Sequence, residues 1–153
     1  MKRAVSATLP PAPPASSAGS KAVMLANRGS ETAPEIALRS ILHRSGLRFR
    51  KHVAPLPGLR CQADVVFTRA KVVVFVDGCF WHRCPLHATF PKANAAWWRA
   101  KLEQNFERDR RNDKALTRAG WTVVRVWEHE DPDAAAGRIE ALLRQRRRDR
   151  AAI

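Results

Sequence analysis

Residues 71–87 read KVVVFVDGCFWHRCPLH, which is the most informative segment of the chain. Residues 72–76 are apolar and mostly β-branched, which is typical of a strand buried on both faces. Asp77 and Gly78 end the run, and two cysteines, two histidines and two bulky aromatic residues follow within the next ten positions. The stretch therefore predicts a buried strand that carries a carboxylate toward a cluster of metal-ligand residues.

The composition narrows the class of protein. A chain of 153 residues with 45% hydrophobic content favours one folded domain. Its 28 Lys and Arg against 14 Asp and Glu give a net charge of +14, so nucleic acid is the favoured partner, and a solvated basic surface or a lipid-binding tail is the alternative. No apolar run approaches the ~20 residues of a membrane span, and we see no secretory signal. Three cysteines, two of them near histidines, indicate metal ligands in a reducing compartment.

Helical and strand patterns alternate along the rest of the chain. Residues 1–21 are rich in Ala, Pro and Ser, so we expect a disordered leader, followed by a short helix at about 22–27. Pro34 predicts the start of a helix capped by Ser30 or Thr32, and Gly46 predicts its end. The other predicted elements are strands at 48–53, 62–67, 72–77 and 122–127, a hairpin turn at 68–71, and helices at 95–119 and 133–147. This order predicts an α/β or α+β domain, residues 22–150, with one central sheet.

Three acids have positions that suit phosphodiester chemistry. Asp64 lies in one predicted strand and Asp77 ends the next, so both carboxylates can converge on one Mg²⁺, which in a basic protein suggests metal-assisted hydrolysis. Taken alone, either acid is more often a turn or cap residue. Asp109 lies on the apolar stripe of the long helix, where pairing with His82 would orient the imidazole to activate water. A surface ion pair of Asp109 with a neighbouring arginine is the equal alternative.

Cysteine and histidine side chains predict a second metal site. Cys79, Cys84 and His87 have a spacing that suits three ligands of a tetrahedral zinc ion, and His129, after the last strand, is the candidate fourth. Such a closed site would be structural and would tie the loop to that strand. His82 lies in the same segment and leaves other ligand choices open, and two buried thiols without metal are the alternative.

Aromatic pairs adjoin both the cysteines and the long helix. Phe80 and Trp81 follow the first cysteine, and Trp97 and Trp98 open the helix. Rings near a basic surface can stack on bases or wedge between them. Core packing is the alternative, and it accounts for at least one ring of each pair.

Together these segments resemble the very short patch repair (Vsr) mismatch endonuclease family. The resemblance covers residues 27–130 and is most specific in GCFWH (78–82) and NFERDRR (105–111). It implies a restriction-endonuclease-like fold, in which helices flank a central mixed β-sheet, with a structural zinc site. It also implies Mg²⁺-dependent nicking of duplex DNA 5′ to the T of a T:G mismatch. The expected protein is a monomer of the bacterial cytoplasm, associated with the nucleoid and with mismatch-repair proteins.

The resemblance also assigns roles to single residues. Asp64 matches the aspartate that binds Mg²⁺, and the backbone carbonyl of Val76 matches a second metal ligand. His82 matches the histidine proposed to activate water, Asp109 matches the acid paired with it, and Glu35 matches a glutamate near the metal waters. The zinc ligands would be Cys79, Cys84, His87 and His129, and the intercalating aromatics would be Phe80, Trp81 and Trp98.

Three positions depart from the family pattern. Ala63 stands where the family often has proline before the metal aspartate, which should matter little. Asp77 stands where the best-known members have histidine, so its carboxylate could bind the metal directly, as in PD-(D/E)xK nucleases. His129 stands in place of cysteine, which preserves zinc chemistry. Two alternatives remain open: a related nuclease of a restriction–modification or defence system, and a zinc-stabilised DNA-binding module without catalysis.

Overall fold

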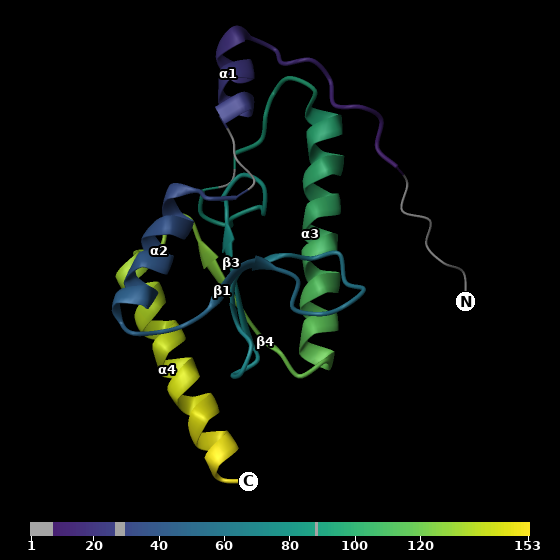
Figure 1. Ribbon diagram of the computed structural model, residues 1–153. Coiled ribbons are helices and arrows are strands. Elements are labelled where there is room, and N and C mark those ends of the chain that lie inside the picture. Colours follow the sequence, from purple (N-terminus) through teal and green to yellow (C-terminus); the bar gives the residue numbers. More distant parts are fainter. Residues whose placement is uncertain (1–7, 27–29, 88) are drawn as a thin grey trace, which may run out of the picture.

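The computed structural model describes residues 8–26, 30–87 and 89–153, which form a sheet with helices on both faces (Figure 1). The helices are α1 (Ala18–Ala26), α2 (Ala33–Arg44), α3 (Ala95–Arg118) and α4 (Pro132–Ala151). The strands are β1 (Arg50–Val53), β2 (Ala63–Phe67), β3 (Val72–Asp77) and β4 (Thr122–Trp127). The predicted α/β class is therefore confirmed. Within the described residues, no helix is both long enough and apolar enough to span a membrane.

The sheet is mixed, with the strand order β1-β2-β3-β4. The β1–β2 and β2–β3 pairs are antiparallel, whereas β3 and β4 are parallel and are joined by the long crossover that parallel pairing needs, here through α3. In β3, Val74 pairs with Val65 on one side and Val124 on the other. The apolar run of β3 is thus a central strand, and its residues 72–75 are all buried, as predicted for a strand covered on both faces.

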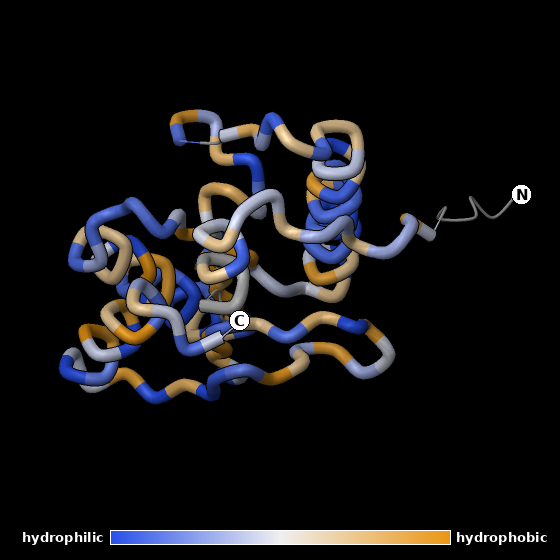
Figure 2. The backbone as a smooth tube through the Cα atoms, turned by 90° about the horizontal axis from the view of Figure 1, so that it is seen from above, coloured by the Kyte–Doolittle hydropathy of each residue, from blue (hydrophilic) through white to orange (hydrophobic). Residues whose placement is uncertain are grey.

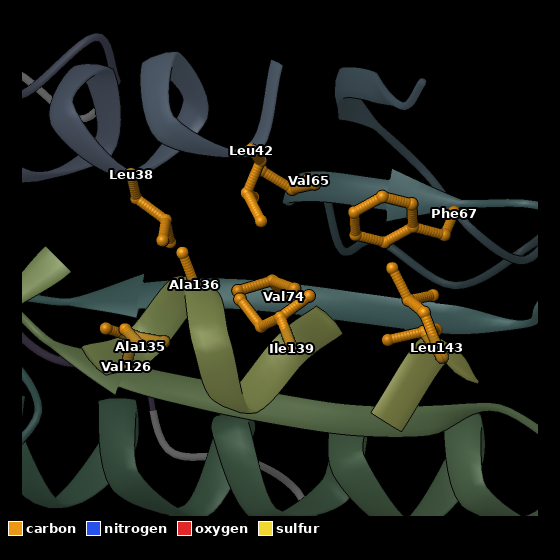
Figure 3. Packing of buried hydrophobic residues seen from close by; sticks show 11 residues of the cluster. Leu38, Leu42, Val65, Phe67, Val74, Val126, Ala135, Ala136, Ile139 and Leu143 are labelled. Atoms are coloured by element: carbon orange, nitrogen blue, oxygen red, sulfur yellow. The ribbon is translucent and has the colours of Figure 1, made fainter. Parts of the chain in front are cut away.

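Two apolar clusters hold the helices to the sheet. On one face α2 and α4 pack against the strands, and Figure 3 shows Leu38 and Leu42 of α2 and Ile139 of α4 meeting Val65 and Val74. The other face is covered by α3 through the second cluster, whose buried members are Ala63, Val66, Val73, Phe75, Leu116 and Trp121. Hydrophilic and hydrophobic stretches alternate along α3 in Figure 2, as expected for a helix with one face on the sheet.

Several element ends differ from the prediction. Helix α1 begins at Ala18 because Ser17 caps it, its Oγ accepting a hydrogen bond from the Ser20 N–H at 3.0 Å. The predicted boundary after Lys21 therefore falls inside a helix, and the division into leader and domain stays a prediction. Residue 27, the predicted end of this helix, lies outside the described residues. Helix α4 continues to Ala151, because basic side chains near a helix C-terminus favour its dipole.

The start of α2 differs from the prediction in its capping contact. Thr32 is the N-cap residue and Pro34 lies in the first turn, but the Thr32 side chain makes no capping hydrogen bond. Instead, Glu35 Oε2 accepts a hydrogen bond from the Glu31 N–H at 2.9 Å. This contact holds Glu35 inward, where it is only 3% exposed.

Candidate active site

One end of the sheet opens into a cavity of about 310 Å³. Because β2 and β3 are antiparallel, Asp64 near the start of β2 and Asp77 at the end of β3 lie at this same end. The residues predicted for catalysis all line the cavity: Glu35, Asp64, Asp77, His82 and Asp109. The structure thus brings together groups that are up to 74 residues apart in sequence (109 − 35).

Asp64 is fixed to the neighbouring strand. Its Oδ2 accepts a hydrogen bond from the Val76 N–H at 2.7 Å, beside the carbonyl expected to be a metal ligand. Burial raises the pKa of Asp64 to about 6, and the nearby Glu35 carboxylate adds to this effect, while the Val76 hydrogen bond opposes it. A buried carboxylate next to another acid fits a divalent cation, which would replace the proton that this environment favours.

His52 is a site residue that the sequence did not predict. Glu35, His52 and Asp64 each bring one ligand atom within 4.8 Å of the others, so this group could hold a metal ion. His52 Nε2 lies 3.8 Å from Glu35 Oε2, and Nδ1 lies 3.9 Å from Asp64 Oδ1. The backbone of His52 has a φ of 50°, a conformation that non-glycine residues keep only when their surroundings enforce it.

An ion-pair network from α2 supports His52. Arg39 Nη2 lies 2.6 Å from Glu31 Oε2, and Arg39 Nη1 reaches Glu35 Oε2 at 3.4 Å. His52 Nε2 lies 3.1 Å from Glu31 Oε1, and the Lys51 ammonium lies 3.0 Å from the same oxygen. The hydrogen bond from Lys51, together with the contacts from Arg39, lowers the pKa of Glu31 to about 2. The network joins β1 to α2 and thereby places His52 beside Asp64.

His82 and Asp109 form the predicted pair. His82 Nδ1 lies 2.5 Å from Asp109 Oδ2, while Arg108 Nη2 donates to Asp109 Oδ1 at 3.1 Å, so both contacts considered for this acid occur. Burial acts to raise the pKa of Asp109, but the hydrogen bond and charge of His82 outweigh it and lower the pKa. An ionised Asp109 favours a proton on Nδ1, which leaves Nε2 of His82 as the basic nitrogen.

Asp77 has a partner that the sequence analysis did not identify. It is 4% exposed, and Arg125 Nη1 donates to its two oxygens at 2.9 and 3.1 Å. Arg125 also donates to both oxygens of Asp113, at 3.0 and 2.7 Å, and its guanidinium lies 4.5 Å from the centre of the Phe75 ring. Burial raises the pKa of Asp77. Direct metal binding by Asp77 stays a prediction, and it would require the carboxylate to exchange Arg125 for the ion.

The four predicted zinc ligands also come together. Cys79 Sγ lies 3.1 Å from His129 Nδ1, and Cys84 Sγ lies 3.8 Å from both His87 Nδ1 and His129 Nδ1. Their four ligand atoms lie within 4.8 Å of one another, and His82 belongs to the catalytic cavity instead. Burial, followed by the adjacent Cys84, raises the pKa of the Cys79 thiol to about 12. A thiolate at Cys79 therefore needs a cation beside it, and two cysteines with two histidines suit Zn²⁺.

The three predicted intercalating residues form one aromatic cluster. The ring of Phe80 lies 5.1 Å from Trp81 and 5.4 Å from Trp98, measured between ring centres. All three side chains are partly exposed, and they line a cavity of about 730 Å³. Trp97 contacts Trp98 and donates from Nε1 to the Pro10 carbonyl at 3.0 Å. The cluster is therefore accessible rather than part of the buried core.

Comparison with known proteins supports a nuclease, as the geometry of the site does. The sequence model of the family described as DNA mismatch endonuclease Vsr matches residues 16–87. The type II nicking enzyme V.NaeI of Lentzea aerocolonigenes is 49% identical over 128 residues, which are 82% of this chain and 77% of that protein. The type II nicking enzyme V.XorIIP of Xanthomonas oryzae pv. oryzae is 44% identical, over 76% of this chain and 83% of its own. The DNA mismatch endonuclease Vsr of Escherichia coli is 41% identical, over 64% of this chain and 62% of its own.

Fold, site and similarity together define a DNA endonuclease, a hydrolase of phosphodiester bonds. Specifically, the chain belongs to the Vsr family of DNA mismatch endonucleases. A DNA-binding module without catalysis, one of the two alternatives left open by the sequence, is thereby excluded.

Proposed function

We propose that this chain nicks duplex DNA 5′ to the T of a T:G mismatch, as in very short patch repair. The observation that carries the proposal is the shared cavity, where Asp64 and the His82–Asp109 pair face the same space. A carboxylate that can hold a divalent cation, beside an imidazole oriented to accept a proton from water, suits metal-assisted phosphodiester hydrolysis. A restriction-endonuclease-like fold, proposed from the family resemblance, would place such a cavity against the DNA backbone.

We further propose that Mg²⁺ binds Asp64 and the Val76 carbonyl, with Glu35 and His52 beside it. The ion would supply charge to polarise the scissile phosphate. His82, oriented by Asp109, would accept the proton of the attacking water at Nε2. Arg125 would keep Asp77 ionised at the rear of the cavity.

Recognition would fall to the aromatic cluster and to the zinc site. Zinc bound by Cys79, Cys84, His87 and His129 would hold the loop after β3 against the end of β4. That loop carries Phe80 and Trp81, which lie next to Trp98 of α3. Wedging these rings into the duplex costs unstacking free energy, and a mismatched pair is the easiest to unstack.

A second candidate function keeps the nicking reaction and changes its target. Two of the relatives described above bear the name type II nicking enzyme, which favours a nuclease that works beside a restriction–modification system. Such an enzyme would share the catalytic cavity and differ in the bases it prefers around the nick. In either case the expected enzyme is a monomer that acts on DNA in the bacterial cytoplasm, at the nucleoid and together with mismatch-repair proteins.

Strand-specific cleavage tests both candidates. Duplexes that carry one T:G, T:A or C:A pair in the same sequence, labelled on either strand, are incubated with the chain and Mg²⁺. We expect one nick 5′ to the mismatched T, and no nick with His82→Ala. Equal cleavage of matched and mismatched duplexes would reject mismatch specificity, and unchanged activity of His82→Ala would remove His82 from the mechanism.

A further inference from the structure

Another cavity, of about 660 Å³, lies at the opposite end of the sheet from the catalytic cavity. Strand β2 spans the two, because Asp64 near its start lines the catalytic cavity and Phe67 at its end lines this one. The walls come from the segment before β1, the turn between β2 and β3, and the last turns of α4, near the C-terminus in Figure 1. The two cavities share no lining residue.

The charge of this cavity is unbalanced. Six arginines and no acid line it: Arg48, Arg50, Arg69, Arg146, Arg147 and Arg150. In the part of the chain that the structure describes, none of the six forms an ion pair. Three of them make hydrogen bonds to neutral groups instead: Arg48 to the Leu47 carbonyl, Arg146 to the Thr122 hydroxyl and Arg150 to the Arg69 carbonyl. Like charges held together without counter-charges favour an anionic ligand, and guanidinium groups bind carboxylates or phosphates through paired hydrogen bonds.

The floor of the cavity is apolar, which further restricts the chemical class of ligand that fits it. Leu47, Phe49 and Ala70 are partly exposed there, above the buried side chains of Phe67 and Leu143. The volume lies within the range of about 300–1,000 Å³ that is usual for ligand pockets. Duplex DNA presents its phosphates on a convex surface and has no apolar group that projects into such a floor. A peptide that combines acidic residues with a large apolar side chain matches both the rim and the floor.

We propose that this arginine-lined cavity docks an acidic segment of a partner protein, anchored by one large apolar side chain. The apolar side chain contacts Leu47 and Phe49, and the carboxylates pair with arginines on opposite walls, such as Arg69 and Arg147. Because the two cavities share no lining residue, the partner segment and the scissile phosphate would occupy different sites. This proposal does not depend on which mismatch or sequence the enzyme prefers.

Fluorescence anisotropy with two labelled hexapeptides tests the proposal on the full chain. One probe has four aspartates followed by phenylalanine and serine, and its control has four aspartates followed by two serines. We expect the apolar probe to bind about tenfold more tightly, because its phenylalanine reaches the floor. Arg147→Glu/Arg150→Glu should weaken its binding by at least about tenfold. Arg48→Glu/Arg69→Glu, on the opposite wall, should do the same without any change in α4.

The matched control is Arg144→Glu/Arg148→Glu. These two residues are exposed on the same helix and do not line the cavity, so the net charge changes equally. The control should change binding of the apolar probe by less than about threefold, and all variants should nick DNA like the native chain. Equal binding of the two probes, or equal weakening in control and cavity variants, would show only general charge attraction and overturn the proposal. Loss of affinity for a short DNA duplex in the cavity variants alone would also overturn it, because the cavity would then be a DNA contact.

Discussion

The imidazole of His82 and the carboxylate of Asp109 are in contact, with Nδ1 and Oδ2 2.5 Å apart, although they come from a loop after β3 and from the middle of α3. Helix α3 lies across one face of the sheet, and its Asn105 side chain donates to the Trp81 carbonyl at 3.5 Å. The loop and the helix are thus held together next to the pair. Since the contact fixes the ring orientation and its tautomer, the pair has the geometry of an oriented general base.

Replacing Asp109 by Asn should show whether Asp109 acts through its negative charge or only by orienting the His82 ring. The amide keeps the size of the side chain but cannot stabilise a protonated His82, so we expect kcat to fall by about 100-fold or more with little change in KM for DNA. Single-turnover nicking measures the effect. Glu107→Gln, an exposed acid on the same helix, is the matched control and should keep native activity. A variant Asp109→Asn with native kcat would show that the pair is structural only.

Metal binding should depend on pH through Asp64. Its pKa of about 6 lies above the ordinary 3.8, so a proton competes with the cation below pH 6, and the apparent Mg²⁺ affinity should fall up to about tenfold per unit there. Without metal, the folded state holds this proton more tightly than the unfolded chain, and stability is lost as pH rises from about 4 to 6. Asp64→Asn should therefore stabilise the metal-free protein at pH 7.5 by about 1–3 kcal/mol and abolish the Mg²⁺-induced rise in Tm. A Mg²⁺ affinity that stays constant between pH 5 and 7 would contradict this assignment.

His52→Gln should weaken metal binding without unfolding the chain. Glutamine retains hydrogen bonding toward Glu31 and Arg39 but takes the imidazole away from Asp64 and Glu35. We expect the metal Kd to rise by about tenfold or more, measured by calorimetry with Mn²⁺, a cation that accepts imidazole ligands. His43→Gln, an exposed histidine of α2, serves as the control. Unchanged Mn²⁺ affinity in His52→Gln would exclude His52 from the metal site.

The sequence predicted the site residues that lie in short motifs and missed His52 and Arg125, whose positions in the site depend on strand register. The run at 72–76 is apolar throughout, so it predicted a strand, and Asp77 follows it directly. The sequence did not predict the place of His52 because β1, with the sequence RKHV, shows no clear alternation of polar and apolar side chains. Only the pairing of β1 with β2, which sets Lys51 opposite Val65 and Val53 opposite Ala63, places His52 opposite Asp64.

Arg125 was missed for a related reason. It interrupts the apolar strand β4, and its meaning depends on the parallel register that sets it beside Phe75 of β3, two residues before Asp77. Parallel neighbours are joined through a long crossover, here α3, so local sequence contains little information about their alignment. The zinc ligands needed no such register, because three of the four lie within residues 79–87.

Removing Arg125 should be more harmful than removing the whole ion pair. Arg125→Gln leaves Asp77 buried without its counter-charge, and we expect a loss of about 3–5 kcal/mol in the free energy of unfolding. Adding Asp77→Asn should recover part of this loss, because the buried charge is then gone. Urea unfolding in metal-free buffer measures both variants. If the double variant were no more stable than Arg125→Gln, Asp77 would not be the group that Arg125 stabilises.

The Cys79–Cys84–His87–His129 group should contain one zinc ion per chain. Zinc bound there would replace the thiol protons that burial favours at Cys79 and would join the loop after β3 to the end of β4. We expect elemental analysis of the purified chain to find one zinc, and Cys84→Ser to lose it together with a marked fall in Tm. Cys61→Ser, at a partly exposed free cysteine outside the group, should keep both the zinc and the Tm.

Since Asp64 and His82 lie outside the zinc group, dialysis of the native chain against Mg²⁺ after chelation should not restore the Tm, whereas Zn²⁺ should. Recovery with Mg²⁺ alone, or a chain that contains no zinc and melts normally, would mean that the four residues pack without a metal.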